Sequence, residues 1–170
     1  MDEVSLDKRN ERDTDAFVDH LAPLLQEQRW LAERIADARP FTSVRMLHKA
    51  LFNEVMDAGD RRRCDLIAAH DGVLPTEGDA PAIEDREDEA EDLLAKPWSK
   101  LAADYRSRFG FDFVLASPPS EETKLRLVLE ERMANTEADE RLAALREISE
   151  ITFERLEAAF RIREKTDAEA

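Results

Sequence analysis

The chain has 170 residues, of which 42% are hydrophobic and 38% charged, and its net charge at pH 7 is -15. That hydrophobic content is enough to close one core of ordinary size, so a single domain is expected. The acidic surface argues against nucleic acid and anionic membranes as partners, because an array of phosphates would be repelled.

Cysteine and glycine usage narrow the class of protein further. Cys64 is the only cysteine, which excludes an internal disulfide framework and a thiolate metal cluster within one chain. The first residues lack the apolar core of a signal peptide, and no stretch approaches the roughly 20 apolar residues of a membrane span. We therefore expect a cytoplasmic protein. With only four glycines and abundant alanine, leucine, glutamate and arginine, the composition favours an all-α fold.

The first part of the chain is expected to hold a short arm followed by helices. Residues 1–12 are charged and aperiodic, which predicts a flexible N-terminal arm. Apolar residues recur at helical spacing from Phe17 to Ile35, and Pro23 is expected to divide this stretch into two helices. The second should end at Arg39, because the proline that follows disfavours the helical conformation.

Capping residues mark the next two helices. Thr42 or Ser43 can cap a helix that runs to about Ala58 and is ended by Gly59. The residues of this helix expected to face inward are Met46, Ala50 and Leu51. Asp60 is expected to cap the helix that follows.

Three later helices are expected, from Pro97 to Gly110, from Ser120 onward, and from Thr136 to about residue 165. Ser120 is the expected N-cap of the second, and Thr136 with the acid three residues on resembles a capping box. The expected buried residues of the second are Leu125, Val128, Leu129 and Met133. The sequence thus predicts an all-α, single-domain bundle of about seven to nine helices over residues 13–165, with a short tail at 166–170.

His70 lies where the apolar stretch LIAAH, residues 66–70, runs out towards a glycine. A histidine at a helix end commonly serves as a cation that relieves the exposed carbonyl groups. The same imidazole could instead act as a general acid or base near neutral pH. The position of His70 alone leaves both interpretations open.

An acidic run follows a loop rich in glycine and proline. Between Glu77 and Asp92 nine of sixteen residues are acidic, and only Arg86 is basic. Most runs of this kind form a solvated helix face and no more.

Arg155 falls within the apolar stripe of the last expected helix. That stripe is formed by Leu145, Ile148, Ile151, Thr152, Leu156 and Ala159. Arg155 follows Ile148 by seven residues, which at ~100° per residue places it about 20° away from it. A guanidinium directed at a core needs a carboxylate, either from the protein or from a ligand. Arg155 is therefore expected in a buried ion pair or in a ligand site.

Four separated segments form a pattern along residues 17–160. They are Phe17 and Trp30 followed by ARPFTS at 38–43, LIAAH at 66–70, YRSRFGFDF at 105–113, and RMANTEADERLAALREISEITFERL at 132–156. In this order and spacing they resemble the 2-oxo-4-hydroxy-4-carboxy-5-ureidoimidazoline (OHCU) decarboxylase family of urate breakdown.

The resemblance implies an all-helical and usually dimeric enzyme that has no metal or organic cofactor. Its small-molecule substrate would be the ureidoimidazoline, which it would convert to (S)-allantoin and CO2 as a carbon-carbon lyase of purine catabolism. Two alternatives stay open. The chain could be a divergent, non-catalytic homologue that acts as a binding or interaction module, or it could decarboxylate a different ureido acid.

The resemblance also implies site residues. The essential histidine of the family falls on His70, its substrate-contacting arginine on Arg155, and the glutamate of its Ser-x-x-Glu-Gln motif on Glu87. His70 would exchange a proton with the substrate, and Glu87 would hold the ureido or ring N–H groups. The remaining substrate-binding positions are Asp71, Glu84, Asp88, and the backbone of Phe113, Val114, Leu115, Ala116 and Ser117.

The chain departs from the family pattern at several of these positions. Asp71 replaces a proline, Ala102 an asparagine, and Asp112 the proline of FGFPF. Glu84 and Asp88 stand where the motif has serine and glutamine. One added negative charge at ~4 Å from an anionic substrate would cost on the order of 4 kcal/mol at an effective dielectric of about 20. These two side chains are therefore expected to turn away or to be protonated, unless the ligand differs.

Overall fold

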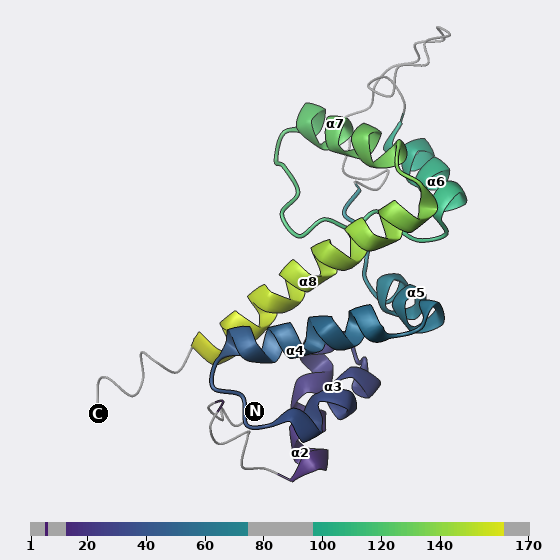
Figure 1. Ribbon diagram of the computed structural model, residues 1–170. Coiled ribbons are helices and arrows are strands. Elements are labelled where there is room, and N and C mark those ends of the chain that lie inside the picture. The colour runs from purple at the N-terminus through teal and green to yellow at the C-terminus, as the bar shows by residue number, and fades with distance from the viewer. Residues whose placement is uncertain (1–5, 7–12, 75–96, 162–170) are drawn as a thin grey trace, which may run out of the picture. The chain divides into compact units, whose positions relative to one another are not determined.

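The computed structural model describes residues 6, 13–74 and 97–161, and within these residues it contains seven α-helices, two 3-10 helices and no strand (Figure 1). The predicted all-α class and number of helices are confirmed. None of the helices in the described residues is long and apolar enough to cross a membrane.

The helices form two compact units. One unit comprises Met1–Ala69 with Ile148–Ala170, and the other comprises His70–Glu147. The predicted arm at 1–12 and tail at 166–170 fall almost entirely outside the described residues, so the predicted domain bounds of 13–165 stay a prediction.

The first unit begins with short helices broken at prolines. Its elements are α2 (Thr14–Leu21), the 3-10 helix η1 (Ala22–Leu25), α3 (Arg29–Ile35), the 3-10 helix η2 (Ala36–Ala38), α4 (Val44–Asp57) and α5 (Asp60–Ala68). Pro23 lies in the first turn of η1, and Arg39 has an extended backbone after η2. Both predicted breaks are therefore confirmed, and Figure 1 shows α2, α3 and α4 in succession.

The predicted caps of α4 and α5 are correct in one case and wrong in the other. Ser43 caps α4, because its hydroxyl accepts a hydrogen bond from the backbone N–H of Met46 at 3.2 Å. The N-cap of α5 is Gly59, and Asp60 is the first residue of the helix, where its carboxylate pairs with Arg63 at 2.7 Å.

Met46 was expected to face the core, and this is wrong because its side chain is 51% exposed. The buried residues of α4 are Leu47, Leu51 and Val55. These recur every four residues, whereas Met46 and Leu51 are five residues apart and point about 140° away from each other.

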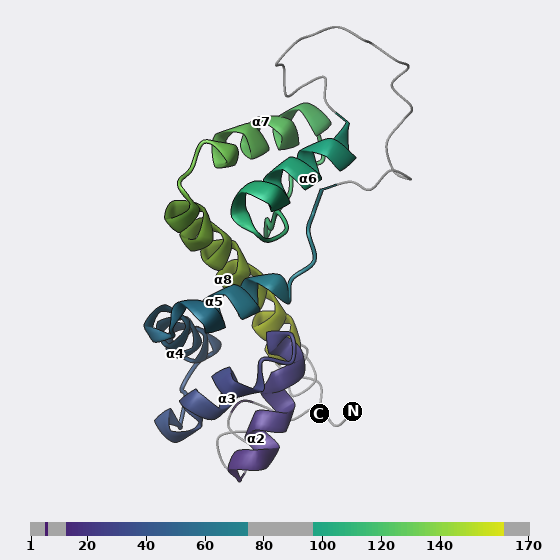
Figure 2. The ribbon, with the colours of Figure 1, turned by 90° about the vertical axis from the view of Figure 1, so that its right-hand side faces the viewer.

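The second unit contains α6 (Trp98–Phe109), α7 (Glu122–Met133) and the start of α8 (Glu137–Arg161), which Figure 2 shows from a second direction. As predicted, α6 begins after Pro97 and ends at Gly110, whose φ of 82° suits glycine. The cap of α7 was expected at Ser120, but the N-cap is Glu121, without a side-chain hydrogen bond.

The buried face of α7 differs from its prediction because it includes arginines. Leu125 and Leu129 are buried as expected, whereas Val128 and Met133 are half-buried. Arg126 is only 3% exposed, and its guanidinium carbon lies 4.2 Å from the centre of the Trp98 ring. The guanidinium also pairs with the carboxylate of Glu122 at 2.8 Å, and this ion pair and the ring together make the burial tolerable.

The predicted cap at Thr136 is confirmed, although Asp139 bonds back to the Thr136 hydroxyl and not to its backbone N–H. The hydroxyl of Thr136 accepts a hydrogen bond from the backbone N–H of Asp139 at 3.2 Å and donates one to its carboxylate at 2.7 Å. The helix then continues without a break from the second unit into the first. Its described end is Arg161, and the predicted end near residue 165 lies outside the described residues.

Candidate active site

His70 lies just beyond the end of α5, whose C-cap is Ala69. The side chain is only 6% exposed. A histidine that serves merely as a helix-end cation gains from facing water, because burial disfavours a permanent charge. The burial of His70 therefore favours the interpretation as a site residue.

The residues after His70 run beside the segment that follows α6. The backbone N–H of Val73 donates a hydrogen bond to the carbonyl oxygen of Phe113 at 2.9 Å. At Gly72 a Cβ atom would lie 3.0 Å from Cβ of Asp112, so only glycine permits this approach without a shift. The structure thus brings together two stretches that the sequence pattern singled out separately.

Most side chains of residues 113–117 belong to the core, and the predicted contact of their backbone with a substrate stays a prediction. Phe113, Val114 and Leu115 are each at most 9% exposed, whereas Ser117 is exposed. Two backbone groups are already occupied. The carbonyl of Phe113 accepts from Val73, and the N–H of Ala116 donates to the carboxylate of Glu147 at 2.9 Å.

A buried polar cluster supports this segment, and the sequence pattern did not reveal it. Glu140 is fully buried and accepts hydrogen bonds from the hydroxyl of Tyr105, from Nε of Arg132 at 2.8 Å, and from the side-chain amide of Asn135 at 2.7 Å. The edges of the Phe111 and Phe113 rings pack on Tyr105, with ring centres 5.9 and 5.2 Å away.

The cluster shifts the pKa values of two of its members. Burial, and then the hydrogen bond to Glu140, raise the pKa of the Tyr105 phenol above its ordinary value. Burial of the Arg132 guanidinium is the largest single effect and lowers its pKa, but the hydrogen bond to Glu140 and the charges of Glu140, Tyr105 and Glu147 together outweigh burial and raise the pKa. Tyr105 is therefore a neutral donor, and Arg132 carries the positive charge of the cluster.

A signal for these acids was present in the sequence. Glu140 and Glu147 are seven residues apart on α8, so they share one face of the helix. The same spacing identified Arg155 from Ile148. Applied to the acids, it places two carboxylates on one face near the start of α8, but about 80 to 100° from Ile148, so it does not show that this face is buried.

Arg155 is half-buried on α8 in the first unit. With the amide of Gln26 turned so that its oxygen faces the guanidinium, that oxygen accepts hydrogen bonds from both terminal nitrogens at 3.0 and 3.2 Å. Among the described residues, no carboxylate forms an ion pair with Arg155. A neutral amide orients the guanidinium without cancelling its charge, which favours a ligand site over an internal ion pair.

The other predicted site residues divide into two groups. Asp71 is exposed beside His70. Glu84, Glu87 and Asp88 lie outside the described residues. His70 belongs to the second unit and Arg155 to the first, so a common site stays a prediction.

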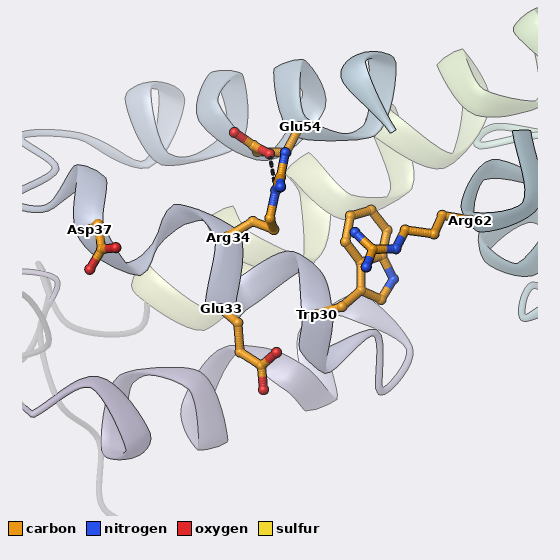
Figure 3. Close-up of a pocket in the computed structure, with 6 residues that line it drawn as sticks. All are labelled: Trp30, Glu33, Arg34, Asp37, Glu54 and Arg62. Carbon is orange, nitrogen blue, oxygen red and sulfur yellow. Dashed lines mark hydrogen bonds and ion pairs between the residues drawn. The ribbon is translucent and has the colours of Figure 1, made fainter. Parts of the chain in front are cut away.

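A pocket of about 450 Å3 lies in the first unit, and none of its lining residues is a predicted site residue (Figure 3). Its lining residues are Trp30, Glu33, Arg34, Asp37, Glu54 and Arg62. Arg34 is paired with Glu54 at 2.7 Å, and the guanidinium of Arg62 stacks 4.9 Å from the centre of the Trp30 ring, as Figure 3 shows. With three acids against two bases, this pocket offers no net positive charge to an anionic substrate.

A helical chain with a buried histidine, followed by a loop that bonds to the segment after α6, fits the class of helical decarboxylases. The sequence profile described as OHCU decarboxylase matches residues 10–157, and the chain belongs to this family. The match runs through both compact units, so one family domain includes them.

Known relatives agree with this assignment. The chain is 32% identical to the 2-oxo-4-hydroxy-4-carboxy-5-ureidoimidazoline decarboxylase of Haloferax volcanii, over 94% of this chain and 98% of that protein. It is 28% identical to the decarboxylase of the same name from Halalkalicoccus jeotgali, over 92% of each. It is also 30% identical to the uric acid degradation bifunctional protein PucL of Bacillus subtilis, over 89% of this chain and 32% of PucL.

A solved structure shares the fold. The crystal structure of (S)-allantoin synthase superposes with a TM-score of 0.72 at 18% identity. The alignment covers 92% of this chain and 54% of that one, so this chain spans about half of its length. This similarity supports the helical architecture.

Proposed function

We propose that the chain decarboxylates 2-oxo-4-hydroxy-4-carboxy-5-ureidoimidazoline to (S)-allantoin and CO2 in the breakdown of urate. Membership of the OHCU decarboxylase family supports this activity. The observation in the structure that carries the proposal is the burial of His70 just before a loop whose Val73 bonds to Phe113, so that the chain after one family segment meets another.

The reaction needs an electron sink and a proton. The carbon–carbon bond to the carboxylate breaks, CO2 leaves, and the electron pair moves onto the ring, where the neighbouring imine can take it up. One proton must then reach one face of the ring to give a single stereoisomer. An imidazole can take the hydroxyl proton of the substrate or deliver the new one near neutral pH. We assign this role to His70.

Two further residues complete the proposed site. Arg155 would anchor the anionic or carbonyl oxygens of the substrate as a bidentate donor. Its partner Gln26 is neutral, so the positive charge of Arg155 is not offset. Glu87 would hold the ureido or ring N–H groups. Free backbone groups of residues 113–117 would line the same substrate, with Asp71, Glu84 and Asp88 as flanking positions.

The setting of the enzyme is also part of the proposal. A homodimer is proposed because the family that the sequence resembles is usually dimeric. A cytoplasmic location is proposed from the single cysteine, which suits a reducing compartment.

The activity can be tested directly on the unstable substrate. Urate oxidase and hydroxyisourate hydrolase generate it in the cuvette, and circular dichroism follows the appearance of (S)-allantoin with and without the protein. We expect a clear acceleration over spontaneous decay, with a signal of one sign. No acceleration by protein that far-ultraviolet circular dichroism shows to be helical would reject the proposal and favour a non-catalytic binding module.

A further inference from the structure

Glu147 contacts the backbone segment proposed to face the substrate. Its Oε2 atom accepts the hydrogen bond from the N–H of Ala116 at 2.9 Å. Its side chain is 28% exposed, and Ala116 is half-buried. A carboxylate is a stronger acceptor than water or an amide for such a backbone group.

The Glu147 carboxylate is itself held by the buried cluster. Its Oε1 atom lies 3.8 Å from Nη1 of Arg132, whose Nε binds the fully buried Glu140. The Arg132 guanidinium also lies 5.4 Å from the centre of the Phe113 ring. Arg132 thus contacts both Glu140 and Glu147 of α8. It lies near Phe113 at one end of the backbone segment and reaches Ala116 at the other end through Glu147.

The opposite end of this segment is fixed by a different contact. Phe113 accepts the hydrogen bond from Val73, three residues after His70, and its ring packs on Tyr105. Between the anchors at Phe113 and Ala116, the side chains of Val114 and Leu115 are buried. The segment is therefore clamped at both ends, and its remaining polar groups have defined directions.

We propose that Glu147 is a positioning residue for substrate binding. Its carboxylate holds the backbone at Ala116 so that the free polar groups of residues 114–117 meet the substrate, and Arg132 keeps that carboxylate in place. The inference rests on the proposed function, because the substrate that this segment binds is the ureidoimidazoline.

The test compares three variants of Glu147 with a control on the same helix. Glu147→Ala removes the acceptor, Glu147→Gln keeps an oxygen in reach but removes the charge, and Glu147→Asp keeps the charge on a side chain one methylene shorter. Glu150→Ala removes an exposed acid nearby. For each, kcat and KM come from the allantoin assay, and the amide proton shift of Ala116 comes from NMR of labelled protein.

The proposal predicts a split between the two kinetic constants. Glu147→Ala should raise KM roughly tenfold or more while kcat changes by less than about threefold, because a displaced binding group weakens substrate contacts. Glu147→Gln should stay within about threefold of the wild type in both constants, since its carbonyl can still accept from Ala116. Glu150→Ala should match the wild type.

Several results would overturn the inference. A KM within about twofold of the wild type in Glu147→Ala would do so, as would a Glu147→Gln variant impaired as badly as Glu147→Ala. If Glu147→Ala does not fold, Glu147→Asp decides, and the same rise in KM is expected because its oxygen falls short of Ala116. If the wild type itself is inactive, the proposed function fails. The Ala116 shift then still reports whether Glu147 holds the backbone.

Discussion

At the scale of single residues, His70 is buried and lies three residues before Val73, which bonds to Phe113, and this predicts a chemical role. His70→Asn should lower turnover roughly 10²- to 10⁴-fold, the usual contribution of a general acid or base. The free energy of unfolding should fall by at most about 1 kcal/mol, because asparagine fills much of the same space. Allantoin formation and chemical denaturation measure the two effects.

His20 is the matched control because it lies in the last turn of α2, where a cation stabilises the helix end. His20→Asn should cost about 0.3 to 1 kcal/mol of stability and leave turnover intact. The same result for His70→Asn would show that His70 is only a helix-end cation.

Arg155 makes a second prediction. Arg155→Ala should raise KM by roughly 10²-fold, because a bidentate charged contact to the substrate is lost. Stability should change little, since the described partner is the neutral amide of Gln26. Arg155→Lys should recover only part of the affinity, because an ammonium cannot form the paired contact. A loss of several kcal/mol in unfolding with KM unchanged would instead indicate an internal ion pair.

Tyr105 gives the chain a predictable dependence on alkaline pH. Burial, and then its bond to Glu140, raise the pKa of its phenol above the ordinary value near 10. The folded protein therefore keeps a proton that the unfolded chain loses. The contribution of Tyr105 to the free energy of unfolding is fully present below about pH 10. Above pH 10 the free energy of unfolding should fall by about 1.4 kcal/mol per pH unit. The raised pKa of Arg132 acts only at still higher pH.

Because Tyr105 is the only tyrosine, its ionisation can be read from absorbance near 295 nm without assignment. We expect that signal to appear only as the protein unfolds. Tyr105→Phe should be less stable near neutral pH, through the lost hydrogen bond to Glu140, and should lack this part of the alkaline slope. A phenol that ionises at about pH 10 in the folded protein would contradict the prediction.

Site residues could be predicted from the sequence only where a polar residue breaks or ends the apolar pattern of its own helix. Arg155 interrupts an apolar stripe, and His70 ends one, so both were found from spacing. Glu147 and Arg132 were not, because each looks like one more charge in a chain that is 38% charged. What distinguishes them is contact with Ala116 and Glu140, and such partners are set by the tertiary fold rather than by local periodicity.

At the scale of elements, the close approach at Gly72 links the loop after α5 to the segment after α6. Gly72→Ala would place its Cβ 3.0 Å from Cβ of Asp112, whose carboxylate is held by Nε of Arg106 at 2.8 Å. We expect a loss of about 1 to 3 kcal/mol in unfolding and a drop in turnover, as the two segments move apart. Thermal unfolding and the allantoin assay provide the measurements.

Two further variants make this prediction specific. Gly72→Ala combined with Asp112→Gly removes the opposing Cβ and should restore part of the lost stability. Gly59→Ala controls for the loss of a glycine, because its Cβ would meet open space. Equal damage from Gly72→Ala with and without Asp112→Gly would show that steric contact is not the cause.

Helix positions followed from the sequence more reliably than helix faces. The breaks at Pro23 and Arg39, the end at Gly110 and the cap at Thr136 were all predicted, because proline, glycine and capping side chains act locally. The burial of Arg126 and the exposure of Met46 were not. Which side of a helix is covered depends on its neighbours, and Arg126 is covered by Trp98, which is distant in sequence.

At the scale of the whole molecule, a net charge of -15 shapes stability independently of any contact. Most of the acids in the described part of the chain are exposed, so they repel one another in the folded state more than in the expanded chain. Added NaCl should therefore raise the melting temperature by roughly 2 to 8 °C, which corresponds to one or two kcal/mol for a chain of this size. The described surface ion pairs oppose this trend only weakly, because each contributes little.

The shape of the salt dependence separates this cause from others. Screening of surface charge is largely complete by about 0.2 M, where the Debye length has fallen below about 8 Å. We therefore expect most of the rise in melting temperature, followed by circular dichroism, between about 0.01 and 0.2 M NaCl. A rise that begins only near 1 M would instead reflect exclusion of salt from the protein surface. A melting temperature that falls with added salt would mean that ion pairs such as Arg34–Glu54 outweigh the repulsion.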